Sequence, residues 1–534
     1  MKKFIAFMLS ILFIVSVCSA CTNKKIEHNG EKIELTVWAI LSPECTDYET
    51  NRQSEWYYEK TGVKINWVTV PAQGWADAFQ RSVMSGEWPD IYLYDFSTEE
   101  VKACVDYEVI KPLNELIENN CPNVNKWINE DTELKEAITS PDGNIYTLFA
   151  KSYDINEFTQ KLWVNKSWLN KYKNATGNDI PKTTDEFEEM LLFFKNNDMN
   201  GNGDANDEIP YLGVNGRDGI CTLINAFVPT NYSRNSFGCY NNGNGVKFTL
   251  KTDEYREGLK YVNKLYEKNL ITDKTFTTSG NELYSYVGTD DSNSMVGVVT
   301  GGSIDNIIGL TNSQTDYDYD DFVVIPPLSS SISDGTYVTF NNTIALKDAI
   351  TTNCKYPEEA AKWLDYWFSE EGRLWSVNGG EKDVQWWYDD GESITGKGKV
   401  VVHTTDDSLL ENACWGSQGV SYMIGQQDFE KMDINSIAKN RMLATYMANE
   451  EYRKVAVDSG WPSLVWTTDE TSEYSVEYSE LANSIETYAV KGYTDFIIGE
   501  RDINDDAQWK SYCEGYNELK LDRFIELIEL YSKG

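Results

Sequence analysis

The stretch Glu34-Leu-Thr-Val-Trp38 opens the pattern that decides the fold of this chain. Its short apolar run predicts a strand. Amphipathic stretches with a helical period and further short apolar runs follow it in turn. The expected order is strand, helix, strand, helix, strand, over residues 34–38, 54–61, 63–70, 79–84 and 89–94. This order predicts an α/β fold with a mainly parallel sheet, in which ligands bind at the carboxyl ends of the strands.

A second α/β region begins near Lys161. Thr183 and Glu186 form a capping box that predicts the start of a helix, and a strand is expected over 295–300. The large apolar residues that follow Pro357 have the spacing of one helical face, and so do those over 519–531. We assign both stripes to core packing rather than to ligand binding.

The composition excludes several classes of function. The chain has 534 residues and a formal net charge of −38, which argues against nucleic acid because phosphate binding needs clustered Lys and Arg. The sequence has two histidines and no nucleophile elbow, phosphate loop or dinucleotide fingerprint, so we expect no enzyme. The 17 Trp, 33 Tyr and 20 Phe residues suit a surface that stacks on flat, partly apolar ligands such as sugars.

The N-terminus predicts export. Lys2 and Lys3 precede an apolar run over 4–17, which is too short to span a membrane and fits a signal peptide over 1–20. Cys21 follows small residues, as in a bacterial lipobox, and 21–30 is a polar tether. We therefore expect lipidation at Cys21 and a location on the extracellular face of the cell membrane, held by the lipid alone. The alternative is simple secretion after cleavage near Ala20.

Eight cysteines lie outside the signal and the lipid site, and their spacing matches no zinc pattern. Two pairs of these cysteines are close enough in sequence to form a disulfide in an exported protein: Cys104 with Cys121, or Cys221 with Cys239. Buried free thiols are the alternative.

The loop over 198–208 has the spacing of a calcium loop. Oxygen side chains recur at its first, third and fifth positions, and Gly203 occupies the sixth, where a sharp turn is needed. Position twelve is Ile209 rather than Glu, so Asp207 or Glu208 has to close the shell. We expect a structural Ca²⁺ ion; the alternative is a hydrophilic Asn/Gly turn. The expected ligands are Asp198, Asn200, Asn202, Asp204, Asp207 and Glu208.

Short motifs spread over nearly the whole mature chain resemble those of the extracellular solute-binding proteins of ABC importers. They include Ser85-Gly-Glu-Trp-Pro-Asp90, Leu162-Trp-Val-Asn165, Tyr255-Arg-Glu-Gly258 and Ser369-Glu-Glu-Gly372. The chain is similar to the carbohydrate-type family that includes maltose-binding protein, and most similar to its Gram-positive lipoprotein branch.

This resemblance implies two α/β lobes, each discontinuous in sequence, that close on a ligand in a central cleft by a hinge motion. The first lobe is expected over 31–157 and 338–380, the second over 158–337 and 381–460, and a C-terminal helical segment over 461–534. The closed, liganded form would deliver its solute to the permease subunits of an ABC transporter. We expect the binding protein to be a monomer.

The expected cleft is lined by aromatic and acidic side chains. Tyr94 and Asp95 match positions at which maltose-binding protein places an aromatic ring and a carboxylate on its sugar. Tyr153 and residues 301–303 match other cleft-lining segments. The remaining candidates end the first strand or lie in Gly-rich or Pro-flanked loops. The predicted ligand-binding residues are Trp38, Tyr94, Asp95, Tyr153, Trp415 and Trp461.

Such a cleft favours an oligosaccharide, because aromatic rings cover the C–H faces of a sugar while polar side chains pair its hydroxyls. An oligopeptide is the alternative solute and would need charged groups that clamp its termini. A surface enzyme that acts on glycosides is the third hypothesis, and product formation would reveal it.

Overall fold

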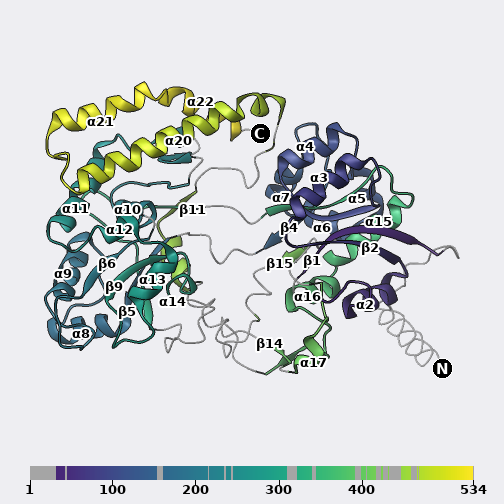
Figure 1. Ribbon diagram of the computed structural model, residues 1–534, viewed down its shortest axis with the longest axis horizontal. Helices are drawn as coiled ribbons and strands as arrows, with labels where there is room; N and C mark the ends of the chain where they lie inside the picture. The colour runs from purple at the N-terminus through teal and green to yellow at the C-terminus, as the bar shows by residue number, and fades with distance from the viewer. Residues whose placement is uncertain are drawn as a thin grey trace, which may run out of the picture.

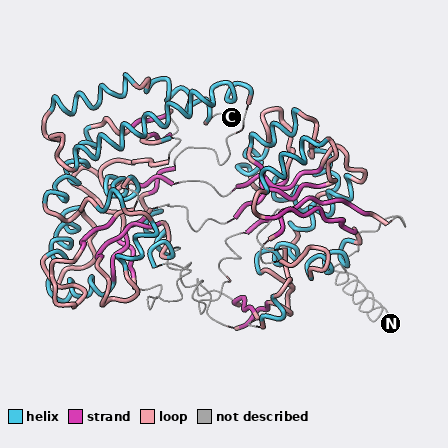
Figure 2. Tube along the Cα trace, in the orientation of Figure 1, coloured by secondary structure: helices cyan, strands magenta, loops and turns pink. Residues whose placement is uncertain are grey.

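Two sheets lie in separate halves of the molecule (Figure 2), which we call the first and the second unit. Within the part of the chain described here, no helix is long and apolar enough to cross a membrane. The computed structural model describes residues 32–42, 45–152, 160–214, 216–233, 236–241, 245–308, 321–339, 344–390, 399–404, 406–415, 422–424, 431, 445, 447–458, 466 and 468–532.

The first unit is built on a six-stranded sheet with the order β15-β4-β12-β3-β1-β2. β1 pairs in parallel with both β2 and β3, while β12 runs antiparallel to β3 and β4. The predicted alternation of strands and helices at the N-terminus is confirmed. The strands are β1 (Glu34–Leu41), β2 (Lys64–Pro71), β3 (Ile91–Phe96), β4 (Leu148–Ser152), β12 (Ile344–Ile350) and β15 (Tyr422–Ile424).

Helices cover both faces of this sheet, with α2 and α16 on one side and α3 and α4 on the other (Figure 1). α2 begins after Asn51, whose side chain accepts a hydrogen bond from the backbone of Gln53, and ends at Gly62 with φ 69°. The helices are α2 (Arg52–Thr61), α3 (Trp75–Ser85), α4 (Thr98–Asp106), α5 (Asn114–Asn120), α6 (Pro122–Glu130), α7 (Thr132–Ile138), α15 (Pro357–Asp365), the 3₁₀ turn η2 (Tyr366–Phe368), α16 (Glu370–Asn378) and α17 (Asp407–Leu410).

The second unit has a four-stranded sheet with the order β10-β5-β9-β6, in which only β6 and β9 are parallel. The predicted capping box forms, since Thr183 and Glu186 each bond the other's backbone at the start of α9. The elements are β5 (Lys161–Asn165), α8 (Lys166–Thr176), α9 (Thr184–Lys195), β6 (Ile209–Leu212), α10 (Arg217–Ile224), β7 (Cys239–Asn241), β8 (Val246–Phe248), α11 (Asp253–Glu267), α12 (Lys274–Thr277), α13 (Gly280–Val287), β9 (Val296–Gly301), α14 (Asp305–Ile308), β10 (Phe322–Ile325), β11 (Tyr337–Thr339) and β16 (Ala456–Asp458).

The C-terminal helices α20 (Asp469–Ile497), α21 (Asp506–Glu518) and α22 (Leu521–Tyr531) run along the second unit (Figure 1). Ile485 and Tyr493 of α20 are buried in the core of that unit. The start of α20 is instead attached to the first unit. Trp466 packs into the first core and its Nε1 donates to Ala137 O at 2.9 Å. Asp469 lies 2.9 Å from Lys102 of α4, so α20 is fixed to both units.

One expected lobe boundary is wrong. Residues 381–460 were expected in the second lobe, yet β15 pairs with β4 in the sheet of the first unit and Trp415 lies in the first core. The hairpin of β13 (Trp386–Asp389) and β14 (Val400–His403) precedes them. Of the described residues in this range, 447–458 pack on the second unit: Ala448 lies in one of its cores, the Tyr452 hydroxyl accepts from Leu162 N at 3.0 Å, and β16 pairs with β11. A strand of three residues carries no sequence signal for the sheet edge that it completes, so its partner could not be foreseen.

The cysteines that the structure describes are free thiols. The eight that the structure describes form no disulfide, and six of them are buried. The two pairings considered from the sequence, Cys104 with Cys121 and Cys221 with Cys239, are therefore wrong, and the alternative of buried thiols is confirmed. Burial raises the pKa of Cys104 to about 12. A thiol with so high a pKa carries almost no thiolate at neutral pH and is a poor nucleophile.

Candidate functional site

The carboxyl ends of β1, β2 and β3 form one edge of the first sheet. The chain leaves this sheet after β4 and returns to it at Ile344, which pairs with Lys151 of β4. Phe96, near the end of β3, lies opposite Leu346, so β3 ends at the same edge. Because β1 and β2 are parallel to β3, the edge from which the chain crosses to the second unit is their carboxyl edge. Ligands of open α/β sheets bind at such edges.

The second sheet presents a matching edge. Lys161, the first residue of β5 after the crossing, pairs with Gly301, the last residue of β9. β6 is parallel to β9, so the carboxyl end of β6 lies at this edge as well. The two carboxyl edges, one from each unit, are the candidate functional site.

The edge of the first unit carries an exposed indole and an exposed carboxylate. Trp75 is 38% exposed at the start of α3, directly after the loop that follows β2, and its ring lies 5.6 Å from that of Tyr94. Asp95, at the end of β3, is largely exposed and its Oδ1 lies 2.7 Å from Nζ of the buried Lys347. An exposed ring and a fixed carboxylate at the same edge can cover an apolar face and accept hydrogen bonds from hydroxyls.

The edge of the second unit offers mainly backbone groups. The chain turns after β9 through Gly301, Gly302 and Ser303, and Nζ of the buried Lys161 donates to Gly302 O at 2.7 Å. Ser303 is fixed by Asn306, whose Oδ1 accepts from the Ser303 backbone at 3.0 Å. The segment 301–303 lies at the expected edge, where Gly301 is buried and Gly302 and Ser303 are half-buried.

The stacking role predicted for Trp38 and Tyr94 is wrong, because both rings are only 2% exposed. Tyr94 stacks on Phe79 with a centroid distance of 4.1 Å, and Trp38 meets both rings edge-on. The Tyr94 hydroxyl donates to Glu100 at 2.7 Å, and burial together with this bond raises the pKa of Tyr94. Tyr94 contacts the exposed Trp75 ring, while Trp38 packs on Tyr94. Sequence reasoning missed Trp75, although it comes shortly after the carboxyl end of the strand predicted over 63–70.

Trp415 is also a core residue rather than a stacking platform. It is 1% exposed, and its Nε1 donates to Ser54 Oγ at 2.8 Å. The rings of Trp67 and Trp367 approach it edge-on, with centroids 5.0 and 5.2 Å away. The remaining two predicted ligand residues, Tyr153 and Trp461, lie outside the described residues.

The predicted calcium loop is folded around its oxygen side chains. Asp198 accepts from the backbone of Gly201 and of Gly203, at 2.6 and 2.9 Å, and Gly203 has φ 93° at the predicted turn. Asn200, Asn202 and Asp204 likewise accept from the backbone two residues ahead.

Two carboxylate oxygens of this loop have no partner. Asp207 Oδ1 and Glu208 Oε2 are buried without a hydrogen bond. Burial raises the pKa of Glu208, and the nearby charges of Asp207 and Asp198 add to that rise. Among the described residues, no three His, Cys, Asp or Glu side chains lie close enough to hold a metal. The amide oxygens of the loop would therefore have to complete the shell of a hard cation, which fits the oxygen preference of Ca²⁺.

Two sheets joined by crossing segments, with their carboxyl edges toward each other, match a known family. The model of the bacterial extracellular solute-binding proteins matches residues 46–374. The chain belongs to this family. The predicted family and the predicted two-lobed α/β fold are confirmed. The family consists of binding proteins rather than enzymes.

Two curated relatives extend the comparison. This solute-binding protein is 32% identical over 320 residues to the fructooligosaccharide ABC transporter substrate-binding protein FusA of Streptococcus pneumoniae. The alignment covers 58% of this chain and 55% of FusA. The alignment thus spans about half the length of that relative. It is 24% identical over 552 residues to lipoprotein LipO of Bacillus subtilis, covering 100% of this chain and 99% of that one.

Solved structures support the fold. FusA of Streptococcus pneumoniae in complex with kestose matches with a TM-score of 0.65 and 24% identity, covering 94% of this solute-binding protein and 99% of that chain. A solute-binding protein of Bifidobacterium longum infantis described as HMO-binding gives a TM-score of 0.71 at 21% identity, with 94% and 98% covered.

Proposed function

We propose that this protein binds an oligosaccharide between the two carboxyl edges and delivers it to the permease of an ABC importer. The observation that carries the proposal is the exposed Trp75 ring at the carboxyl edge of the first unit, which also carries Asp95. The name of the relative FusA, a fructooligosaccharide-binding protein, supports the same class of ligand. Solutes bind such sites reversibly, since a ring and a carboxylate make contacts with a sugar without a reactive nucleophile.

Capture follows from contacts made with both units. A ligand held by Trp75 and Asp95 on one side and by residues 301–303 on the other binds the closed form more tightly than the open one. Binding of the ligand therefore shifts the population of the protein from the open form toward the closed form. The ratio of the two affinities sets the size of this shift. The permease subunits would recognise this form, and the protein would act as a monomer.

Anchoring at the outer face of the membrane completes the proposed role. Cys21 would carry the lipid and 21–30 the tether that keeps the protein near its permease. Both lie outside the described residues. The relative LipO, which is similar along its whole length, is named a lipoprotein, and this supports the proposal.

The function is tested by isothermal titration calorimetry of the protein without residues 1–30 against kestose, nystose, other oligosaccharides and a set of oligopeptides. We expect saturable binding of an intact oligosaccharide with a micromolar or tighter Kd. Recovered ligands are checked by chromatography. Binding of peptides alone would overturn the substrate class, and cleaved sugar would identify an enzyme instead.

We also propose that the loop over 198–208 holds a structural Ca²⁺ ion. The two buried carboxylate oxygens without a partner, Asp207 Oδ1 and Glu208 Oε2, support this, since burying unpaired charge costs free energy that a bound cation offsets. Asp198, Asn200, Asn202 and Asp204 would supply the other oxygens. When bound, the ion would cross-link the loop that joins α9 to β6.

The calcium proposal predicts opposite effects of Glu208→Gln in the two metal states. Ca²⁺ at 100 times its Kd should add about 2.7 kcal/mol to the free energy of unfolding of the wild type. In a chelator, Glu208→Gln should raise the melting temperature, because it removes one of the repelling charges. In the presence of Ca²⁺, the Glu208→Gln variant should lack most of the increase in unfolding free energy that the ion gives the wild type. Differential scanning calorimetry with and without Ca²⁺ measures both, and Glu500→Gln, an exposed residue elsewhere, is the control. If the melting temperature of the wild type is the same with and without Ca²⁺, the proposal is contradicted.

A further inference from the structure

A buried lysine holds the exposed carboxylate at the carboxyl edge of the first unit. The side chain of Lys347, in β12, is 6% exposed and that of Asp95, at the end of β3, is 65% exposed, while Nζ and Oδ1 lie 2.7 Å apart. Of the residues that the structure describes, Lys347 is the one cation that pairs with this carboxylate. One oxygen of Asp95 is therefore held from within the sheet, and the carboxylate keeps lone pairs that face the solvent.

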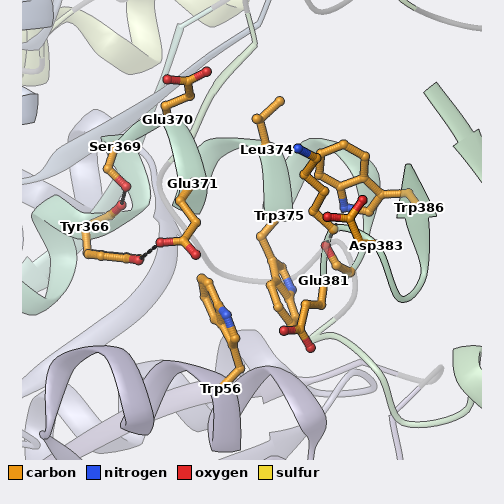
Figure 3. A pocket seen from close by; sticks show the side chains of 12 residues that line it. Trp56, Tyr366, Ser369, Glu370, Glu371, Leu374, Trp375, Glu381, Asp383 and Trp386 are labelled. Atoms are coloured by element: carbon orange, nitrogen blue, oxygen red, sulfur yellow. Dashed lines mark hydrogen bonds between the residues drawn. The ribbon is translucent and has the colours of Figure 1, made fainter. Parts of the chain in front are cut away.

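An ion pair on the surface of the same unit differs from this one. Glu371, on the wall of the cavity in Figure 3, pairs with Lys60 at 2.6 Å, but the Lys60 side chain is 27% exposed. Water can replace either partner there, so such a pair contributes little to stability. The ammonium group of Lys347 is largely out of reach of water, and loss of its carboxylate would be costly. Asp95 is thus kept at Lys347 whether or not a ligand is present.

An irregularity in β12 puts Lys347 on the face of the sheet to which Asp95 belongs. Ala349 lies opposite Tyr92, but Lys347 lies opposite Asp95, so two residues of β3 lie across from Asp348 alone. Opposite residues of an antiparallel pair share a face, and successive residues of a strand alternate between faces. Ala349 therefore shares the face of Tyr92, and Lys347 that of Asp95. In a regular strand, residues 347 and 349 would lie on one face.

Asp348 has a strained backbone at this irregularity. The residue is fully buried and has φ 52°, in the left-handed region that residues other than Gly seldom adopt. In a regular strand Lys347 would lie on the face of Tyr92 and Tyr94, whose rings pack around Phe79. Bulges that re-aim one side chain, and strained residues, are concentrated at functional sites. The ion pair at the carboxyl edge thus depends on the conformation of Asp348.

We propose that Lys347 is a positioning residue of the oligosaccharide site. It holds Asp95 in one orientation, in which the carboxylate accepts hydrogen bonds from sugar hydroxyls. This inference rests on the proposed function, since it assigns a ligand to that carboxylate. Lys347 is buried and does not touch the sugar itself. Because Asp95 is already fixed, it loses little conformational freedom when a ligand binds, and more of the contact energy appears as affinity.

A double-mutant cycle in calorimetric titrations with kestose and nystose tests this role, on the protein without residues 1–30. Asp95→Asn keeps an acceptor but removes the charge, so it should weaken binding about tenfold. Lys347→Met frees the Asp95 side chain, which should weaken binding about threefold to tenfold. The double variant should bind within about twofold of Asp95→Asn, because Lys347 acts only through Asp95. The control Lys491→Met, which removes an exposed ion pair of α20, should change nothing.

Thermal unfolding without ligand provides a second cycle on the same variants. Asp95→Asn should lower the melting temperature of the wild type, because it leaves a buried ammonium group without its carboxylate. In the Lys347→Met background the same substitution should change the melting temperature little. Equal effects of Asp95→Asn in the two backgrounds would show that the two side chains are not coupled, and would overturn the inference.

The outcomes of the titrations distinguish this role from the proposed function. If the wild type binds kestose or nystose and Lys347→Met binds as tightly, the positioning role is wrong and the sugar site stands. If the two effects on affinity multiply in the double variant, Lys347 acts on the fold rather than through Asp95, and the role is again wrong. If the wild type binds no oligosaccharide, the proposed function fails and the positioning role fails with it.

Discussion

Trp415→Ala should lower the free energy of unfolding of the first unit by about 3–5 kcal/mol, the range typical of a large aromatic side chain removed from a core. The ring is 1% exposed and packs in the first core against rings of α2, β2 and the α15–η2 segment. Its contacts include Trp67 and Trp367. The substitution also leaves Ser54 Oγ without its indole donor.

Urea unfolding followed by tryptophan fluorescence and by circular dichroism measures this loss. Trp415→Phe keeps most of the ring and should cost less than half as much. Tyr107→Ala, at a residue that is 62% exposed, serves as the comparison and should change stability by about 0.5 kcal/mol or less. A Trp415→Ala protein that is as stable as the wild type but fails to bind sugar would restore the stacking role that the sequence suggested.

Trp75→Ala should weaken oligosaccharide binding about 10–100-fold, because covering an aromatic side chain is worth about 1.5–3 kcal/mol. The ring is held in place by Tyr94 beneath it, so little conformational entropy is lost when a ligand covers it. Trp75→Phe should recover part of the loss.

The control for this prediction is Tyr107→Ala. Tyr107 is an exposed aromatic residue directly after α4, at the opposite end of that helix from the carboxyl edge. Its removal should leave the affinity unchanged in the same calorimetric titrations. If Trp75→Ala binds as tightly as the wild type, the edge of the first unit is not where the sugar lies.

Periodicity predicted the elements well. β1, β2 and β3 follow from short apolar runs, and the helical stripe after Pro357 lies in the core as expected, with Trp363 and Trp367 fully buried. These patterns are local, because the side chains that create them lie within one element. They do not show which aromatic residues remain exposed.

The exposure of an aromatic ring depends on packing between distant segments. Trp38, Trp415 and Trp75 all follow or lie near strand ends or loops, yet only Trp75 keeps a free face. Trp415 is covered by α2 and by the helices after β12, more than forty residues away in sequence. β15 joins the first sheet for the same reason: its partner β4 is remote, and a short strand does not encode its neighbour.

The attachment of α20 at both ends sets the axis about which the units can rotate. A helix of 29 residues is about 43 Å long and moves as a rigid rod. Its length is fixed to the second unit, where Glu486 pairs with Arg217 at 2.9 Å, while Trp466 is seated in the first. Any rotation that displaced Trp466 would pull its indole out of a core. The motion of lowest cost therefore pivots near Trp466, so the far ends of the carboxyl edges travel furthest and the edge beside α4 travels least.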